Sequence, residues 1–156
     1  MPSRQHFLNV CGIVLAAQIL AASAATAAVS PTEAQLLAAV NQARTDHGLS
    51  PLRVDPRLER AARSHSSEMM RTDSFSHGAF ANRLRVFRAR GTVFGENLAW
   101  GMRVAAETIV AGWLSSPEHR ANMLRPGFRR VGIGVMTGRF LGHSDVMLVT
   151  ADFGGN

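Results

Sequence analysis

The sequence predicts an α+β domain in which helices pack on a small, mainly antiparallel sheet. Apolar residues recur at helical spacing before Gly48, again between residues 56 and 69, and most clearly between residues 105 and 114. Residues 131–136 and 146–153 instead alternate in the manner of strands. Because the helical segments come first and the strand segments last, with no internal repeat, layered helices around one sheet are expected.

Composition sets limits on size and partners. The chain has 156 residues, of which 46% are hydrophobic and 18% charged, as expected of one globular domain rather than a disordered chain. All 17 basic residues are arginine, and the net charge is +6, which favours attraction to anionic polymers or lipid headgroups. The densest run, residues 83–90, divides its arginines between two opposed helical faces. Without an arginine stripe or a nucleic-acid motif, nucleic-acid binding is not expected.

The N-terminal residues are interpreted as a secretory signal peptide spanning residues 1–28. A short polar start containing Arg4 precedes an apolar run from Phe7 to Ala22, and small residues suited to cleavage follow. The alternative is an uncut membrane anchor over residues 7–29, but its Ala/Ser-rich second half favours cleavage. The prediction is a secreted or periplasmic protein with no transmembrane segment after cleavage. Since Cys11 is the only cysteine, the mature domain has no disulfide.

Capping signals define the first two helices. Ser30 and Glu33 form a capping box around Pro31, and Gly48 ends the first helix. Asp55 and Pro56 start the second in the same way. His65 lies on the apolar face of this second helix, which favours a core histidine bonded to an oxygen over a ligand role.

The middle of the chain predicts shorter elements. Residues 73–78, which include His77, break the helical period and are expected to form a loop. A short irregular helix is predicted from Asn82 to Arg90, closed by Gly91. Ser116 is predicted to cap a further helix that starts at Pro117 and carries His119, Arg120 and Asn122.

Glu96 is the most informative residue, because a carboxylate among apolar neighbours needs a proton, a cation or hydrogen-bond donors. The candidates to reach it are His65, His77, His119 and Arg120. An equally weighted alternative is a structural carboxylate bound to backbone N–H groups at a turn beside Gly95.

Five motifs occur together in an order and spacing that resemble the CAP superfamily of cysteine-rich secretory proteins, antigen 5 and pathogenesis-related class 1 proteins. The chain is most similar to the bacterial, cysteine-free SCP-like branch. The resemblance covers residues 32–154 and implies a three-layer α-β-α sandwich with a cleft between helices and sheet. The motifs are Phe75-Ser76-His77, Gly95-Glu96-Asn97-Leu98-Ala99, residues 113–124 with Ser-Pro-Glu-His-Arg-Ala-Asn, Val131-Gly132-Ile133-Gly134-Val135 and residues 150–154.

The resemblance also implies a site. In eukaryotic relatives the cleft holds two histidines and two glutamates and sometimes a divalent metal. His77 and Glu96 match the first of each, whereas the other two positions fall on Ser116 and at or near Leu148. The bacterial motif instead supplies His119.

The preferred functional hypothesis is a monomeric binding module, more a binder than an enzyme, because no activated nucleophile can be identified. Its cleft would bind a small ligand, a lipid or an anionic cell-envelope polymer. The alternative is a hydrolase. In it, His77, Glu96 and His119 would hold Zn or Ca, or His77 and Glu96 would act as an acid/base pair without a metal. Salt bridges from Arg120 to Glu96, Glu107 or Asp152, and a backbone cap by Asn122, are the expected structural roles of those two residues. The predicted site residues are His77, Glu96, Asn97, His119, Arg120 and Asn122.

Overall fold

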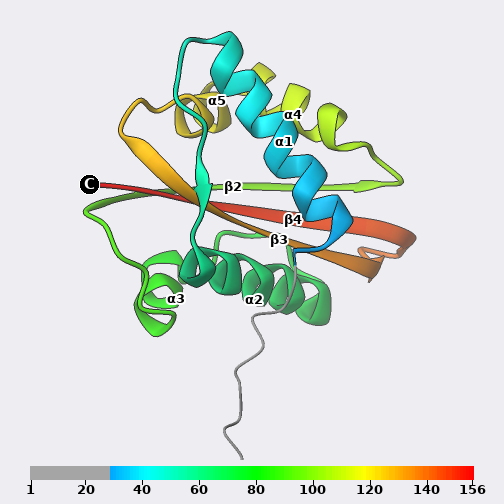
Figure 1. The fold of residues 1–156 in the computed structure, drawn as a ribbon. Helices are drawn as coiled ribbons and strands as arrows, with labels where there is room; N and C mark the ends of the chain where they lie inside the picture. Colours follow the sequence, from blue (N-terminus) through cyan, green and yellow to red (C-terminus); the bar gives the residue numbers. More distant parts are fainter. Residues whose placement is uncertain (1–28) are drawn as a thin grey trace, which may run out of the picture.

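A four-stranded sheet forms the middle layer of the protein, and helices cover both of its faces (Figure 1). The computed structural model describes residues 29–156; the predicted signal peptide and Cys11 lie outside this part of the chain. Helix α2, followed by α3, covers one face, while α1, α4 and α5 cover the other. The elements are α1 (Pro31–Asp46), β1 (Arg53–Val54), α2 (Pro56–Thr72), α3 (Phe80–Val86), β2 (Val93–Met102), α4 (Ala106–Ser115), α5 (Pro117–Met123), β3 (Phe128–Phe140) and β4 (His143–Gly155).

The strand order is β1-β3-β4-β2, so β2 forms one edge of the sheet. Strand β4 pairs antiparallel with both β3 and β2, and the short β1 joins β3 in parallel. The predicted antiparallel pair at residues 131–136 and 146–153 is confirmed, and both strands extend beyond those limits. The α-β-α architecture expected from the motifs is therefore present.

Helix starts follow their capping residues. The Ser30 hydroxyl accepts from the Glu33 backbone N–H at 3.2 Å, and the Glu33 carboxylate accepts from the Ser30 N–H at 2.9 Å. The Asp55 carboxylate accepts from the Arg57 N–H at 2.8 Å. Proline follows each cap, where its missing N–H removes no intrahelical bond.

Two glycines of β3 allow α2 to lie directly on the sheet. A Cβ on Gly132 would overlap the backbone of Leu58 and Glu59, and one on Gly134 would overlap the backbone at residues 62–63. Val131 precedes Gly132, and Ile133 lies between the two glycines. Both side chains point to the other face and join the apolar core under α1 and α4. The Gly/apolar alternation therefore marks a strand with a helix backbone against one side.

Two local predictions are wrong, and a third is confirmed in part. Glu96 lies inside strand β2 rather than at a turn. The sequence did not indicate this strand, because glutamate, asparagine and glycine have low strand propensity. Helix α3 ends at Val86 instead of Arg90, because Arg88 adopts a left-handed conformation with φ 55°. Ser116 is the N-cap residue of α5 and Pro117 starts the helix, as predicted, although the Ser116 hydroxyl accepts no hydrogen bond from a backbone N–H.

Candidate functional site at the edge strand

The edge strand β2 presents Glu96 and Asn97 to opposite faces of the sheet, since successive strand residues alternate. Glu96 points to the side covered by α2 and α3, where it contacts His77 and Arg83. Asn97 points to the side of α5 and bonds to the backbone of His119. One dipeptide therefore joins both helical layers to the sheet.

The Glu96 carboxylate has a separate partner for each oxygen. Its Oε1 lies 2.7 Å from Nδ1 of His77, and its Oε2 accepts a hydrogen bond from Nη2 of Arg83. The Glu96 side chain is only 2% exposed, whereas that of His77 is 59% exposed. A buried anion thus fixes the orientation of a solvent-accessible imidazole, and the other ring nitrogen is available to a ligand. His77 is the predicted candidate that reaches Glu96.

A second buried acid lies opposite the first. Asp152 of β4 is the register partner of Glu96, and it is fully buried. Neither of its carboxyl oxygens has a hydrogen-bond partner within residues 29–156. Burial raises the pKa of Asp152 well above its usual range, and the charge of Glu96 raises it further. The arrangement is one buried guanidinium, that of Arg83, beside two carboxyl groups.

His65 has the structural role that its apolar helix face predicted. Its Nε2 lies 2.8 Å from the carbonyl oxygen of Ser76, so it holds the loop that carries His77. The same nitrogen is 4.0 Å from Oε2 of Glu96, which is too long for a hydrogen bond. Burial lowers the pKa of His65, as does the charge of Arg83, which favours the neutral ring.

On the opposite face, two carboxamides connect α5 to β2. Asn97 Nδ2 donates to the carbonyl of His119 at 2.9 Å. Asn122 Nδ2 donates to the Glu96 carbonyl and to Oδ1 of Asn97, each at 3.1 Å. The predicted backbone cap is thus corrected: Asn122 bonds across to a strand, because Gly95 leaves room for its side chain.

Arg120 forms none of the three predicted ion pairs. Its Nη2 lies 3.2 Å from Nε2 of His47 at an exposed position. Arg83 takes the place beside Glu96 instead, because α3 lies under this end of β2 while Arg120 lies on the far side of the sheet.

His119 lies at a cavity rather than at Glu96. The cavity, of about 430 Å³, is formed mainly by apolar side chains of β2 and α4. Burial lowers the pKa of His119, and the charge of His77 also lowers it. His77 therefore lies close enough to act electrostatically on His119, although only His77 bonds to the carboxylate. The lining residues are Phe75, Leu98, Ala99, Trp100, Val104, Thr108, Ile109, Gly112, Trp113, Ser116 and His119.

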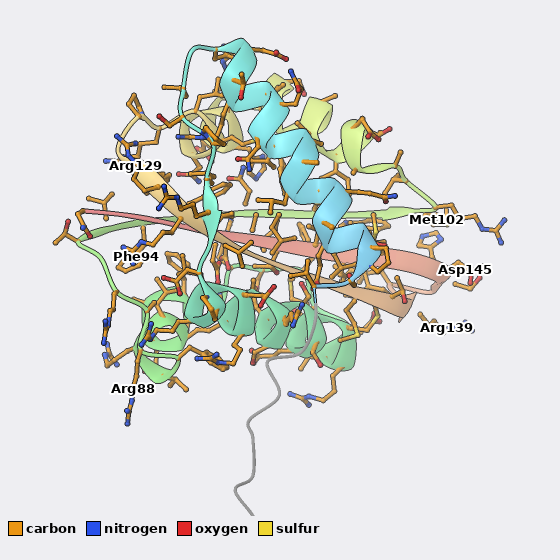
Figure 2. The ribbon with its side chains drawn as sticks, in the orientation of Figure 1. Arg88, Phe94, Met102, Arg129, Arg139 and Asp145 are labelled. Carbon is orange, nitrogen blue, oxygen red and sulfur yellow. The ribbon has the colours of Figure 1, made fainter. Side chains whose placement is uncertain are left out.

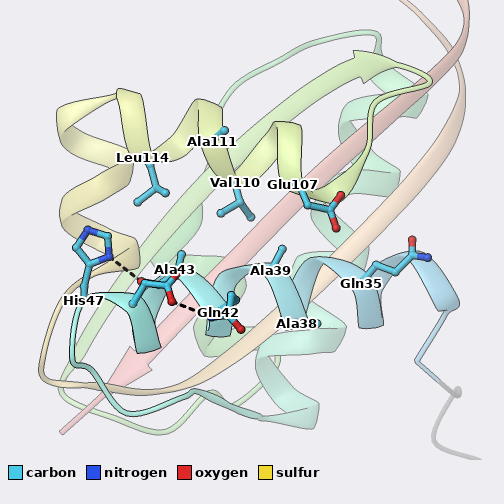
Figure 3. Close-up of a pocket in the computed structure, with 11 residues that line it drawn as sticks. Gln35, Ala38, Ala39, Gln42, Ala43, His47, Glu107, Val110, Ala111 and Leu114 are labelled. Atoms are coloured by element: carbon cyan, nitrogen blue, oxygen red, sulfur yellow. Dashed lines mark hydrogen bonds between the residues drawn. The ribbon is translucent and has the colours of Figure 1, made fainter.

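A second hollow, of about 500 Å³, lies between α1 and α4 (Figure 3). Ala39 and Ala43 face Val110 and Leu114 across it. His47 lies at one end, where its Nδ1 is 2.7 Å from the Ala43 carbonyl oxygen. This groove shares no lining residue with the His119 cavity, so substitutions can address the two separately.

A divalent metal held by His77, Glu96 and His119 stays a prediction. Within residues 29–156, no group of three or more His, Cys, Asp or Glu side chains is placed to hold a metal ion. Both Glu96 oxygens already have partners, and Arg83 supplies the positive charge that a metal would otherwise bring. The donor set therefore fits a metal poorly.

Replacing Asp152 with asparagine is expected to stabilise the protein increasingly as pH rises. A carboxyl pKa that is higher in the folded state contributes stability that is fully present below the unfolded value of about 3.9 and is lost as pH rises through the folded value. The neutral amide abolishes that loss. In urea titrations at several pH values, Asp152→Asn should exceed the wild type by about 1–3 kcal/mol at alkaline pH. A difference independent of pH would contradict a raised Asp152 pKa.

Two residues of this site were not among the predicted candidates. The sequence does not single out Arg83, because the four arginines of the 83–90 run divide between two helical faces and the pattern does not show which face is inward. Asp152 is the one charged residue among positions 146–153, which are otherwise apolar except for Thr150, and that pattern is the signal that could have revealed it.

Known proteins share this fold and sequence pattern. The profile of CAP, the cysteine-rich secretory protein family, matches residues 37–151. The protein YkwD of Bacillus subtilis (strain 168) is 30% identical over 131 residues, which is 77% of this chain and 51% of YkwD. The chain therefore spans about half of YkwD, and it spans 31% of a second Bacillus subtilis relative, the membrane protein YlbC.

Solved structures agree. An extracellular protein containing an SCP domain from Bacillus anthracis superposes with a TM-score of 0.67 at 27% identity, over 79% of this chain and 40% of that one. An outer surface protein from Borrelia burgdorferi has a TM-score of 0.67 at 19% identity, over 78% of this chain and 90% of its own, and shares the fold. None of the helices within residues 29–156 has the length and apolar character needed to cross a bilayer.

Proposed function

We propose that this protein, which belongs to the cysteine-rich secretory protein (CAP) family, acts outside the cytoplasm as a monomeric module that binds a small amphiphilic ligand. The observation that carries the proposal is the cavity of about 430 Å³ beside His119. Its volume lies in the range of small-molecule sites. The extracellular and outer-surface descriptions of two structural relatives support the location.

The chemistry of the cavity selects an amphiphile with an anionic or hydrogen-bonding head. Trp113, which is buried, and Ile109 supply apolar walls suited to a hydrocarbon part. His119, which lines the cavity, and the exposed His77 nearby can supply hydrogen-bond donors for the head. The Glu96 carboxylate orients His77, and it is too buried to contact the ligand directly.

Substitutions on α4 test which cavity is used. Gly112 lines the His119 cavity with open space around its Cα, so Gly112→Leu places a side chain into it. Ala111, one residue earlier, lines the α1–α4 groove, so Ala111→Leu is the matched control. With a fluorescent long-chain fatty acid as probe, Gly112→Leu is expected to weaken binding at least about tenfold and Ala111→Leu less than about threefold. The reverse order would assign the ligand to the groove, and no binding by the wild type would reject the proposal.

The exposed His77 bonded to a buried carboxylate also favours a second candidate, acid/base hydrolysis. The same fluorescent acid, supplied as an ester, separates the two. Recovery of intact ester after prolonged incubation is the outcome expected of a binding module. Cleavage that His77→Gln abolishes would support a hydrolase.

A further inference from the structure

One end of the sheet carries a continuous band of arginines that the ligand cavity does not use. We define the arginine band as Arg88, Arg90, Arg129 and Arg130. Arg88, Arg90 and Arg129 are exposed, and Arg130 is partly buried. Figure 2 shows Arg129 and Arg88 at this end, on opposite sides of the sheet, with Phe94 between them.

The band is continuous because the loop after α3 reaches the ends of β3 and β4. The Thr92 N–H donates to the carbonyl of Gly155 at 3.0 Å. A Cβ on Gly91 would lie 3.0 Å from Nη2 of Arg130, so Arg90 immediately precedes a residue packed on Arg130. Between Arg130 and Arg129 lies a polar hollow of about 230 Å³, lined also by Gly127, Gly155 and Asn156.

An acidic side chain pairs with one of the four arginines of this band. Within residues 29–156, Asp55 is the one carboxylate side chain that pairs with a band residue, at 3.3 Å from Arg130 Nη1. Arg53 is the register partner of Arg130 and adds a further positive charge beside it. The band and Arg53 therefore carry more positive charges than the single carboxylate of Asp55 offsets.

We propose that the arginine band binds a linear polyanion whose repeating groups are phosphates. Guanidinium groups recognise phosphate oxygens through paired hydrogen bonds, and a band that crosses the sheet end fits an extended polymer better than one small anion. This surface is separate from the His119 cavity, so the inference stands independently of the proposed amphiphile.

Nearby groups favour a phosphate polymer over a nucleic acid or a bilayer. Phe75 and Trp100, the exposed aromatic side chains within residues 29–156, belong to the cavity. Phe87 and Phe94 lie beside the band, but both are partly buried against the apolar cluster of Leu58 and Leu84, so the band has no row of exposed rings to stack on successive bases. Val86 is the one large exposed apolar side chain near the band in α3. The exposed Met102 lies at the opposite end of the molecule (Figure 2). Val54, next to Arg53, is also exposed, so the apolar side chains near the band are two single valines and not the cluster of large apolar residues that membrane insertion needs.

The test compares two triple variants with equal change in charge. Arg88→Gln, Arg90→Gln and Arg129→Gln together remove the three exposed charges of the band. Arg71→Gln, Arg103→Gln and Arg139→Gln together remove the same charge elsewhere, with Arg139 at the far end in Figure 2. Fluorescence anisotropy with labelled long-chain polyphosphate is the measurement. The band variant is expected to bind at least about tenfold more weakly at low salt, with a salt slope shallower by about three, and the control less than about threefold more weakly.

The comparison of the two triple variants, together with three further probes, tests the alternatives. The probes are inorganic phosphate, phosphatidylglycerol vesicles and oligothymidylate. Equal weakening in both triple variants would overturn the band in favour of net charge. Displacement of polyphosphate by inorganic phosphate at the same phosphate concentration would overturn polymer recognition. Stronger binding to phosphatidylglycerol vesicles or to oligothymidylate than to polyphosphate would replace the proposed partner with a membrane or a nucleic acid. Matching circular dichroism of all variants confirms that each is folded.

Discussion

Replacing Arg83 with methionine is expected to reduce the free energy of unfolding by about 3–5 kcal/mol. Arg83 is only 8% exposed and is the guanidinium that bonds to the buried Glu96 carboxylate. Its Nη1 also donates to the carbonyl of His77 at 3.3 Å. Without it, Glu96 and Asp152 remain as two buried acids with no guanidinium between them, and the His77 loop loses a hydrogen bond.

Urea unfolding at neutral pH measures this effect, and two variants control it. Arg85 lies on the same helix but is exposed, so Arg85→Met should change stability by less than about 0.5 kcal/mol. Adding Glu96→Gln to Arg83→Met removes the unpaired charge and should recover about half of the loss. If Arg83→Met costs less than about 1 kcal/mol, or the second substitution recovers nothing, the ion pair is not what stabilises this site.

Replacing Gly132 with alanine is expected to cost more than about 3 kcal/mol, at the upper end of overpacking effects. A Cβ at this position would overlap the backbone of Leu58 and Glu59, and a helix backbone cannot move aside as a side chain can. Helix α2 would have to shift away from the sheet. Because α2 also carries His65, the loop that presents His77 should become disordered as well.

The matched control is Gly138→Ala on the same strand. There the new Cβ would meet the thioether of Met70 at 3.1 Å, and the flexible methionine can move. Thermal unfolding followed by circular dichroism should show a large decrease in Tm for Gly132→Ala and a shift of a few degrees for Gly138→Ala. Similar Tm values for the two variants would mean that α2 does not contact the sheet as closely as described.

The stability losses predicted for Arg83→Met and Gly132→Ala concern residues that hold His77 in place, so they also bear on function. Glu96 orients His77, Arg83 neutralises Glu96, and α2 holds the loop that carries His77. The exposed imidazole is thus the end of a chain of buried contacts. Ligand assays on variants of His77 or His119 can therefore be interpreted more directly than assays on Glu96, whose loss would also disturb the fold.

Much of the fold could be predicted because it depends on local patterns. The capping residues Ser30 and Asp55 start their helices through bonds to residues two or three positions away. The alternation over residues 131–136 identified a strand. His77 was identified as a functional candidate from its loop and its motif, and the structure places it against Glu96 as one of the options predicted.

The partners of the buried acids could not be predicted in the same way. Arg83 bonds to Glu96 across 13 positions, and Asp152 faces Glu96 only because β2 pairs with β4 in one register. Arg120 was an equally reasonable partner on chemical grounds. Its exclusion depends on the sheet lying between it and the carboxylate.

By itself, then, the sequence determined the helix starts, the antiparallel strand pair, the family motifs and the demand of Glu96 for a counterion. Only the tertiary structure decided that Arg83 meets that demand, that Asp152 shares the buried site, and that His119 faces a cavity instead. The reason is physical: caps and periodicity act over a few residues, whereas a buried charge is satisfied by whichever group the sheet register and helix packing bring within hydrogen-bonding distance.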